Sequence, residues 1–424
     1  MKLTVSSSTL SGSIAVSGSK SHTIRGIIAA LCANGKSILH APLASEDTLA
    51  TLEAARSLGA EVTCYPDRWE ISGTGGRFTD PGKVIDMKNS GTGLRLLSGV
   101  CALQDFTISF DGDDSLRTRK MSTLLDSFIQ LGAKVNAPTG KCPFSLCGPV
   151  KGGKTTADGQ SSQFLSSLLF SLPLAENDSV IDLEFLNEQP YVGITTSWMD
   201  DLGLVYKKSD DLLHWEIPGK QKIAAFEKNI AADFSTAAFP LIAGLIAGNG
   251  IFIRNLDFND PQGDKKVFDF VEKFGAKIER SKELFIPRQQ KLSGCELDLN
   301  STPDALPILA VAAAFAEGTT ALVNVPQARI KETDRIAVMA QELAKVGIKT
   351  RELPDGLIIH GGTMHAGTVD SHNDHRIAMA FAVAGLAAKE PIIINNAECA
   401  GVSYPGFFDD FKQLGALFKM DQHG

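Results

Sequence analysis

A glycine that follows an apolar, helix-like segment recurs six times along the 424-residue chain, at intervals of 68 to 73 residues. Glycine just past a helix end accepts a left-handed backbone, so each one predicts a helix terminus. The apolar or alternating residues that come next predict a strand. The six positions are Gly59, Gly132, Gly203, Gly275, Gly347 and Gly415.

A second series of short polar segments keeps nearly the same period, with steps of 70 or 71 residues between equivalent positions. Each segment opens an apolar helix-like run, and a strand-like run such as SILHA or PIIINN comes after each helix. The chain therefore reads as six units that each hold two helices and several strands. The segments lie near Ser21, Thr92, Ser162, Asp233, Asp304 and His375.

Six units of this size are large for a solenoid. Three of them could instead close around one pseudo-threefold axis, which predicts two similar domains with a hinge between them. The join is expected near residues 220–232, where KQKIAAFEKNIAAD interrupts the pattern. A continuous array of six units is the alternative that the repeat alone leaves open.

Composition narrows the possible functions. A net charge of −8 argues against a general nucleic-acid surface. No apolar run reaches the ~20 residues that span a bilayer, and the N-terminal MKLTVSSST has no apolar signal core. Seven scattered cysteines, an odd number, indicate reduced thiols and a cytoplasmic setting.

Cations occupy the same turns as the polar helix starts, where the helix dipole disfavours positive charge. Capping alone explains Asp233 and Ser235. An anion held between a cation and a helix N-terminus would explain the cations, which are Lys20, Arg25, Arg95 and Arg376.

Two further basic clusters support an anion site. SLRTRKM carries Arg117, Arg119 and Lys120, and IKETDR carries Lys331, Glu332, Asp334 and Arg335. Lys331 and Arg335 would share a helix face if the helix begins at Lys331. Such a mixed cluster can hold a phosphate and move a proton beside it.

Other chemistries fit poorly. The sequence lacks a GxGxxG or GxxxxGK[ST] loop and a nucleophile elbow. His372 and His375 are three residues apart, but no matching set of zinc ligands accompanies them.

Seven short motifs then resemble, in order, those of the 5-enolpyruvylshikimate-3-phosphate synthase family. They are GSKSHTIR at 18–25, NSGTGLR at 89–95, SSQF at 161–164, PY at 190–191, PDA at 303–305, KETDR at 331–335 and NDHR at 373–376. The resemblance implies an α+β fold of two similar domains, each with three βαβαββ repeats around a pseudo-threefold axis, an inverted α/β barrel. The first domain, residues 13–229, would bind mainly shikimate 3-phosphate. The second, residues 230–424 plus 1–12, would hold the catalytic carboxylates and bind phosphoenolpyruvate.

The resemblance also implies residue roles. Asp304 would take the proton of the attacking 5-hydroxyl, and Glu332 and Lys20 are the candidates for protonating the methylene carbon of phosphoenolpyruvate. Tyr191 would flank the shikimate ring, and His375 would hydrogen-bond near the transferred group. Shikimate 3-phosphate would be held by Lys20, Ser21, Arg25, Ser161, Ser162, Gln163, Asp304 and Lys331. Phosphoenolpyruvate would be held by Lys20, Gly91, Arg119, Gln163, Arg335 and Arg376, and Asn89, Thr92 and Gln327 complete the substrate-binding set.

In such an enzyme the enolpyruvyl group passes by addition to a tetrahedral ketal and elimination of phosphate, and neither step needs a metal or organic cofactor. Domain closure would bring residues of both halves together. Gly91 would leave space beside phosphoenolpyruvate, so the herbicide glyphosate is expected to compete. We expect a cytoplasmic monomer that acts on two small molecules and binds neither nucleic acid nor membrane.

Two departures from the family pattern bear on affinity. Glu188 stands where the family usually has serine, and a carboxylate there would repel the substrate phosphate unless it is paired or turned away. Val402 stands where many members carry lysine. Two alternatives are the related transferase that acts on UDP-N-acetylglucosamine and a non-catalytic repeat protein that binds anions. The first typically has Lys-Asn where this chain has Lys20 and Ser21, with a reactive cysteine that residues 111–121 lack.

Overall fold

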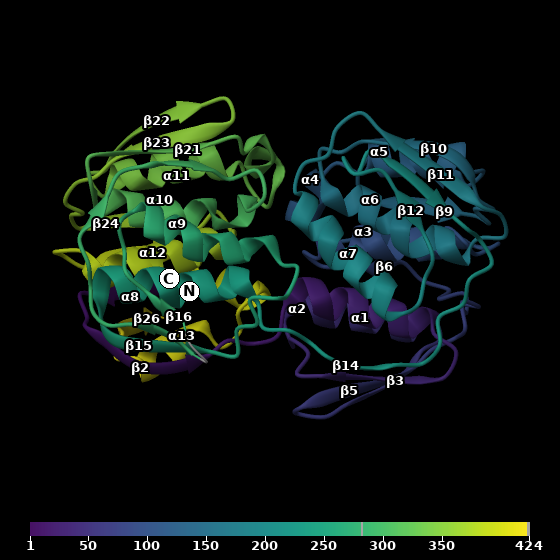
Figure 1. The fold of residues 1–424 in the computed structure, drawn as a ribbon, viewed down its shortest axis with the longest axis horizontal. Coiled ribbons are helices and arrows are strands. Elements are labelled where there is room, and N and C mark those ends of the chain that lie inside the picture. The colour runs from purple at the N-terminus through teal and green to yellow at the C-terminus, as the bar shows by residue number, and fades with distance from the viewer. Residues whose placement is uncertain (281–282, 422–424) are drawn as a thin grey trace. The chain divides into compact units, whose positions relative to one another are not determined.

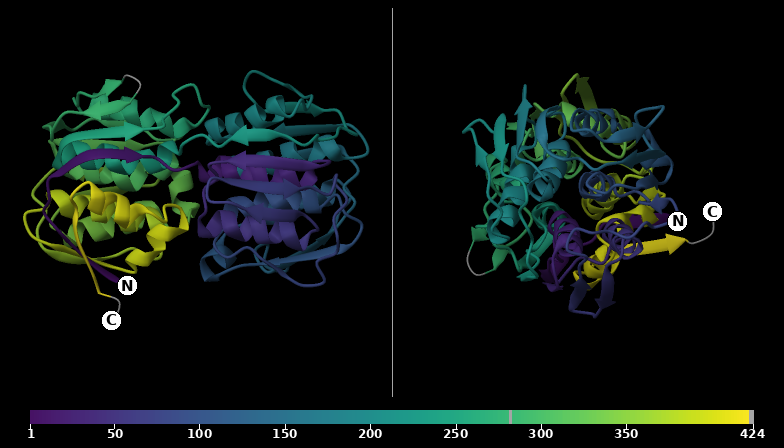
Figure 2. Two further views of the ribbon diagram at one scale, coloured as in Figure 1. Left: turned by 90° about the horizontal axis from the view of Figure 1, so that it is seen from below. Right: turned by 90° about the vertical axis from the view of Figure 1, so that its right-hand side faces the viewer.

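The computed structural model describes residues 1–280 and 283–421, which form two compact units (Figures 1 and 2). Unit 1 contains residues 1–17 and the chain from 232 onward, and unit 2 contains residues 18–231. The chain thus passes from unit 1 to unit 2 and back again. The six repeats form two compact units and not one continuous array. The first passage lies at Gly18 and not at residue 13, because strand β2 (Leu10–Ala15) pairs in parallel with β15 (Gly248–Arg254) of unit 1.

Unit 2 holds three four-stranded sheets of one design. In each, an edge strand pairs in parallel with the second strand, and the second and fourth strands pair antiparallel with the third. In order across the sheets, the strands are β14 (Glu227–Asn229), β3 (Lys36–His40), β5 (Arg68–Ser72) and β4 (Glu61–Cys64); β6 (Ile85–Asp86), β7 (Thr107–Asp111), β9 (Phe144–Cys147) and β8 (Lys134–Asn136); and β10 (Gly153–Ala157), β11 (Ser179–Leu183), β13 (His214–Ile217) and β12 (Lys207–Lys208).

Unit 1 repeats this design in three four-stranded sheets among its described residues, beside the short pair β18 (Leu292–Ser293) and β20 (Ala316–Glu317). The N-terminal strand β1 takes the third position in one sheet, so the first and last strands of the chain are neighbours. The sheets are β2, β15, β17 (Leu284–Ile286) and β16 (Glu279–Arg280); β19 (Glu296–Asp298), β21 (Thr319–Val323), β23 (Gly356–His360) and β22 (Lys349–Leu353); and β24 (Gly367–Asp370), β25 (Ile392–Asn395), β1 (Lys2–Ser6) and β26 (Leu417–Asp421).

Each unit contains two kinds of helix. The predicted polar segments begin apolar helices that pack against one another in the core: α1 (Lys20–Cys32), α3 (Gly91–Cys101) and α6 (Ser162–Ser171) in unit 2, and α8 (Phe234–Ala247), α10 (Leu306–Ala314) and α12 (His375–Ala387) in unit 1. Small residues allow the close approach, since a Cβ on Gly99 of α3 would lie 2.7 Å from the backbone oxygen of Ser167 in α6.

The second kind of helix ends at the six glycines of the repeat. All six have a positive φ, from 70° to 107°, which confirms the predicted left-handed caps. These helices are α2 (Glu46–Ser57), α5 (Ser122–Gln130), α7 (Gln189–Asp201), α9 (Val267–Lys273), α11 (Arg335–Lys345) and α13 (Phe407–Gln413). Short helices complete the fold: α4 (Asp114–Thr118) and the 3-10 turns η1 (Leu172–Leu174), η2 (Gly263–Lys266), η3 (Pro303–Ala305), η4 (Pro326–Ile330) and η5 (Ala397–Val402).

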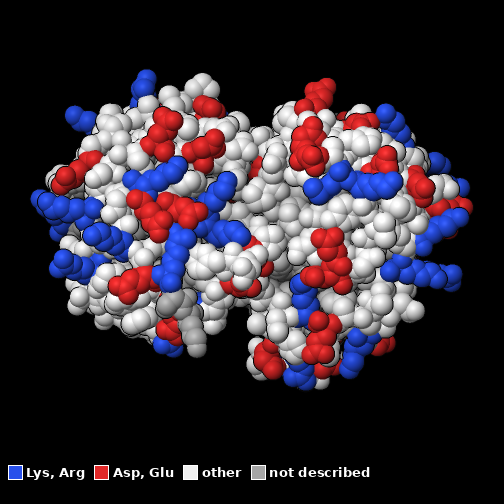
Figure 3. All heavy atoms as spheres, viewed as in Figure 1, with Lys and Arg blue, Asp and Glu red and all other residues white. Residues whose placement is uncertain are grey.

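Within residues 1–280 and 283–421, no helix combines the length and apolar character needed to cross a membrane. Acidic and basic side chains are interspersed over the face drawn in Figure 3. Two largely buried ion pairs lie at helix starts, Lys20 with Asp47 and Arg335 with Asp374.

Candidate active site

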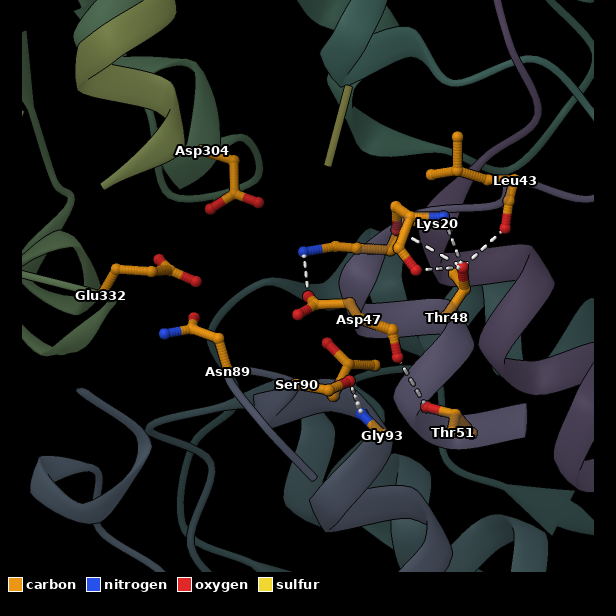
Figure 4. A network of polar contacts seen from close by, with 12 residues as sticks. Lys20, Leu43, Asp47, Thr48, Thr51, Asn89, Ser90, Gly93, Asp304 and Glu332 are labelled. Carbon is orange, nitrogen blue, oxygen red and sulfur yellow. Dashed lines mark hydrogen bonds and ion pairs between the residues drawn. The ribbon is translucent and has the colours of Figure 1, made fainter. Parts of the chain in front are cut away.

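The apolar helices of unit 2 start with serine caps, and cations lie beside these caps. Ser90 accepts a hydrogen bond from the backbone N–H of Gly93 at 3.2 Å, and Ser19 and Ser161 cap α1 and α6 in the same way. Lys20, the first residue of α1, forms an ion pair with Asp47 of α2 at 2.9 Å (Figure 4). Asp47 is buried, so the pair fixes the lysine head at the start of the helix.

Arg119 lies at the start of α3. Its Nη2 donates to Asn89 Oδ1 at 2.6 Å and to Ser115 Oγ at 3.2 Å. Asn89 in turn donates to Asp113 Oδ2 at 2.8 Å. A Cβ on Gly91 would lie 2.7 Å from Arg119 Nη1, so glycine is what lets this guanidinium lie against the helix.

Gln163 joins the starts of α3 and α6. Its Oε1 accepts from Arg95 Nη1 at 2.6 Å, and its Nε2 donates to Thr92 Oγ1 at 3.0 Å. Arg95 also donates to the backbone oxygen of Lys120, and it lies over the ring of Phe164. The amide is thereby held in one orientation between the two helices.

Arg25 is almost fully buried, and every polar partner that the structure gives it is neutral. It donates to Thr195 Oγ1, to Ser166 Oγ and to the backbone oxygens of Ser21 and Tyr191. Burial lowers the pKa of this guanidinium to about 9. Arg25 therefore keeps its positive charge at neutral pH without a carboxylate beside it.

Glu188, which stands where the family usually has serine, is paired with groups of the chain itself. It precedes α7 with a left-handed backbone, φ 55°, and is 2% exposed. Its Oε2 accepts from the backbone N–H of Ser162 at 3.3 Å and from Ser162 Oγ at 2.9 Å. A carboxylate of the chain itself thus lies at the N-terminus of α6.

In unit 1, one guanidinium organises the predicted acidic residues. Arg335, the first residue of α11, is fully buried. It donates to Asp304 Oδ1 at 2.8 Å, to Glu332 Oε2 at 2.6 Å and to Asp374 Oδ2 at 2.7 Å. Burial would lower the pKa of Arg335, but the carboxylates of Asp374, Glu332 and Asp304 raise it above its ordinary value.

Asp304 is surrounded by cations. Arg376 Nη2 lies 3.1 Å from its Oδ2, and Lys331 Nζ lies 3.8 Å from its Oδ1. Burial would raise the pKa of Asp304, but Arg376, Lys331 and Arg335 outweigh it and hold the pKa well below its ordinary value. The carboxylate is therefore ionised throughout the neutral range.

Other predicted residues of unit 1 are buried nearby. Arg376 also donates to Ser235 Oγ at 3.0 Å, which links the starts of α12 and α8. His375 is the buried first residue of α12, and Gln327 of η4 donates to the backbone oxygen of Asn300 at 2.8 Å. Asp233 accepts from the N–H groups of Ser235 and Thr236, so its expected capping role is confirmed.

Lys331 and Arg335 would share a helix face only if a helix began at Lys331, and the structure does not meet this condition. Helix α11 begins at Arg335, so Lys331 lies in the turn before it and does not share a helix face with Arg335. Both cations nevertheless contact Asp304. The carboxylate, and not the helix period, brings them together.

Sequence reasoning missed several partners. Asp47 is signalled only by the Ser45 to Thr48 capping box that opens α2, and Asp374 lies in the NDHR motif without a role having been assigned to it. Asp374 caps α12 through the N–H of Arg376 while it binds Arg335. Arg117 forms exposed ion pairs with Asp111 and Asp114 and takes no part in the clusters described above.

The zinc alternative has no support among the described residues, where no group of three or more His, Cys, Asp and Glu side chains is placed to hold a metal. His372 instead contacts Glu342, at 2.9 Å.

Comparison with known proteins shows similarity to one enzyme family along nearly the whole chain. The family model of EPSP synthase (3-phosphoshikimate 1-carboxyvinyltransferase) matches residues 5–411. A 3-phosphoshikimate 1-carboxyvinyltransferase of Ruminiclostridium cellulolyticum is 42% identical over 99% of this chain and 100% of its own length. The protein of that name from Methanocorpusculum labreanum is 41% identical over 98% and 99%.

Solved structures give the same result for the fold. EPSP synthase from Acinetobacter baumannii superposes with a TM-score of 0.83 at 28% identity and covers 99% of this chain and 100% of that one. The enolpyruvyl transferase NikO from Streptomyces tendae reaches 0.82 at 17% identity, over 100% of this chain and 99% of its own, which supports the fold alone. The α+β fold of two similar three-sheet domains is thereby confirmed.

Proposed function

The chain belongs to the EPSP synthase (3-phosphoshikimate 1-carboxyvinyltransferase) family, and from this premise we propose how its own residues perform the reaction. It is a transferase of the shikimate pathway that moves the enolpyruvyl group of phosphoenolpyruvate to the 5-hydroxyl of shikimate 3-phosphate. The observation that carries the assignment of residues is the Arg335 cluster, in which one buried cation orients both Asp304 and Glu332. An anion-binding repeat protein would need neither carboxylate.

Unit 2 supplies most of the acceptor site. The buried charge of Arg25 and the start of α6 at Ser161 and Ser162 favour the phosphate of shikimate 3-phosphate. Tyr191, whose backbone oxygen accepts from Arg25, flanks the ring. Lys20, Ser21 and Gln163 complete the acceptor set on this unit, and Lys331 and Asp304 contribute from unit 1.

Phosphoenolpyruvate carries a phosphate and a carboxylate, so it needs several cations. Arg119 and Lys20 lie at helix starts in unit 2, and Arg335 and Arg376 lie at helix starts in unit 1. Asn89 and Gly91 contact Arg119, and Thr92 is hydrogen-bonded to Gln163 at the start of the same helix. Binding neutralises an anion that would otherwise repel the acceptor.

The reaction proceeds by addition and elimination. Asp304 takes the proton of the 5-hydroxyl while the hydroxyl oxygen bonds to C2 of phosphoenolpyruvate. Glu332 or Lys20 delivers a proton to C3. The tetrahedral ketal then loses a C3 proton as the C2–O bond to phosphate breaks, which restores the double bond and releases phosphate. His375 and Gln327 position the groups around the reacting carbons.

The cation cluster also controls when Asp304 can act. A carboxylate held by Arg335, Arg376 and Lys331 is a weak base. Anionic groups of phosphoenolpyruvate compete for the same cations, so their arrival strengthens Asp304 as a base. Proton removal is thereby restricted to the complex that holds both substrates.

Phosphate release from phosphoenolpyruvate tests the assignment when it is measured with shikimate 3-phosphate, with UDP-N-acetylglucosamine and without acceptor. We expect release with shikimate 3-phosphate only, and release from Asp304→Asn slowed by about 10²–10⁴-fold. Release with the nucleotide sugar alone would identify the related transferase, and no release with any acceptor would favour an anion-binding protein.

We further propose that the enzyme acts as a cytoplasmic monomer without a cofactor.

A further inference from the structure

The carboxylate of Glu188 is buried at a place where few residues would be stable. The residue has a left-handed backbone, which is uncommon for a long side chain. The neighbouring backbone holds it there, because the N–H of Asn187 donates to the oxygen of Gly159 at 2.9 Å. A Cβ on Gly159 would lie 1.7 Å from the oxygen of Phe185, so the two loops touch backbone to backbone.

Two independent features favour an anion where the Glu188 carboxylate lies: the N-terminus of α6 and the buried charge of Arg25. Helix α6 has ten residues, and its first N–H groups attract negative charge. Arg25 contacts Ser166, one helical turn beyond Ser162, and Tyr191 in the first turn of α7, and it has no carboxylate partner among the described residues. The buried carboxylate of Glu188 and the buried guanidinium of Arg25 therefore contact the same helix, at Ser162 and at Ser166.

We propose that the Glu188 carboxylate occupies the position of the acceptor's phosphate at the N-terminus of α6, and that it sets acceptor affinity by competing with that phosphate. The inference rests on the proposed function for the identity of the acceptor. The N–H and the O–H of Ser162 each have one hydrogen, and Glu188 Oε2 now accepts both. A phosphate dianion that takes these donors must displace the carboxylate, since two anions at one helix start repel each other.

This competition has a measurable consequence. Part of the affinity that Arg25 and α6 offer to phosphate is offset by the loss of the Glu188 hydrogen bonds. The chain therefore distinguishes a phosphorylated acceptor from an unphosphorylated one less strongly than it would with a short neutral residue at position 188.

Three variants separate charge, size and position. Glu188→Ser removes the carboxylate, and Glu188→Gln removes the charge while it keeps the shape, so the second variant serves if the first does not fold. Glu184→Gln is the matched control, because Glu184 is an exposed carboxylate of the same loop. Steady-state kinetics give KM for shikimate 3-phosphate and for phosphoenolpyruvate, and unphosphorylated shikimate serves as the second acceptor.

We expect Glu188→Ser to lower KM for shikimate 3-phosphate about tenfold, to leave KM for phosphoenolpyruvate within about twofold, and to raise the preference for shikimate 3-phosphate over shikimate about tenfold. Glu188→Gln should lie between Glu188→Ser and the natural chain, and Glu184→Gln should match the natural chain. An unchanged or raised KM for shikimate 3-phosphate in folded Glu188→Ser and Glu188→Gln would overturn the proposal.

Calorimetric binding of inorganic phosphate keeps this proposal separate from the proposed function. If no variant turns over shikimate 3-phosphate, the functional assignment fails, and the phosphate titration then decides the present proposal alone. Tighter phosphate binding by Glu188→Ser, about tenfold, supports displacement of the carboxylate. Equal binding by Glu188→Ser and the natural chain contradicts it.

Discussion

Arg335 and Arg25 are both buried arginines, but their surroundings differ in charge. Arg335 of unit 1 contacts three carboxylates, which raise its pKa. The hydrogen bonds that Arg25 of unit 2 makes within the described part of the chain go to hydroxyl and carbonyl oxygens, and burial lowers its pKa to about 9. Unit 1 thus neutralises Arg335 internally, whereas the described residues place no carboxylate within hydrogen-bonding distance of Arg25.

The difference separates two uses of a buried cation. Arg335 organises groups of the chain itself, so its loss leaves buried negative charge uncompensated. The charge of Arg25 is desolvated in the folded chain, so it can be neutralised by a bound anion. One arginine therefore stabilises the fold and orients the acid–base residues, and the other is prepared for substrate.

The largest expected effect follows from removing the counterion of unit 1. Arg335→Met should lower the free energy of unfolding by about 3–5 kcal/mol, because Asp304, Glu332 and Asp374 lose their shared partner. Urea unfolding measures the change, and Arg351→Met, at an exposed position, is the control. A urea midpoint of Arg335→Met equal to that of the natural chain would break the contrast between the two arginines.

Asp304→Asn tests the acid–base role within the same cluster. We expect kcat to fall by about 10²–10⁴-fold, while substrate binding measured by calorimetry stays close to that of the natural chain. Loss of binding in parallel with kcat would mean that Asp304 only holds the cations in place.

The acid stability of Asp304→Asn gives an independent test. Because the folded pKa of Asp304 is depressed, its ionised form stabilises the fold above the unfolded pKa of about 3.9, and this stabilisation is lost as pH falls toward the folded pKa. The natural chain should therefore lose more stability than Asp304→Asn below about pH 4 in unfolding measured against pH. Identical acid profiles would contradict the depressed pKa.

Local features of both units could be predicted from the sequence. The starts of the apolar helices and the glycine caps depend on residues a few positions apart, and the repeat made them visible. The partners of the cations could not be predicted in the same way. Asp374 reaches Arg335 across 39 residues, and Glu188 reaches Ser162 across 26, so both contacts depend on how helices pack.

Sheet completion shows the same limit. The strand β14, at the end of unit 2, pairs with β3 near its beginning, and β1 pairs with β25 and β26. The repeat period predicts that similar sheets form. It does not predict which strand, distant in the sequence, completes a sheet that the neighbouring strands leave one strand short. That choice depends on closure of each unit.

Arg25→Met tests whether the buried arginine of unit 2 contributes to substrate binding more than to stability. We expect a change of less than about 1 kcal/mol in the free energy of unfolding, because the lost hydrogen bonds are offset by relief of a desolvated charge. KM for shikimate 3-phosphate should rise at least about tenfold, with KM for phosphoenolpyruvate changed less. If Arg25→Met were as unstable as Arg335→Met in urea, the two arginines would have the same structural role.

The smallest effect is expected at Gly91, where a cation of unit 2 lies against a helix start. The methyl group of Gly91→Ala would lie 2.7 Å from Arg119 Nη1, and Arg119 is also held by the neutral groups of Asn89 and Ser115. The guanidinium must shift for the methyl group to fit, and it can do so because Nη1 is the far end of a flexible side chain.

We therefore expect Gly91→Ala to raise KM for phosphoenolpyruvate about threefold to tenfold, to raise the inhibition constant of glyphosate by more, and to change kcat little. Gly401→Ala is the matched control, since a Cβ there meets nothing within 4 Å and its φ lies outside the left-handed range. Unchanged inhibition by glyphosate in Gly91→Ala would remove Gly91 from the phosphoenolpyruvate site. A collapse of kcat would instead show that Arg119 is held as rigidly as Arg335.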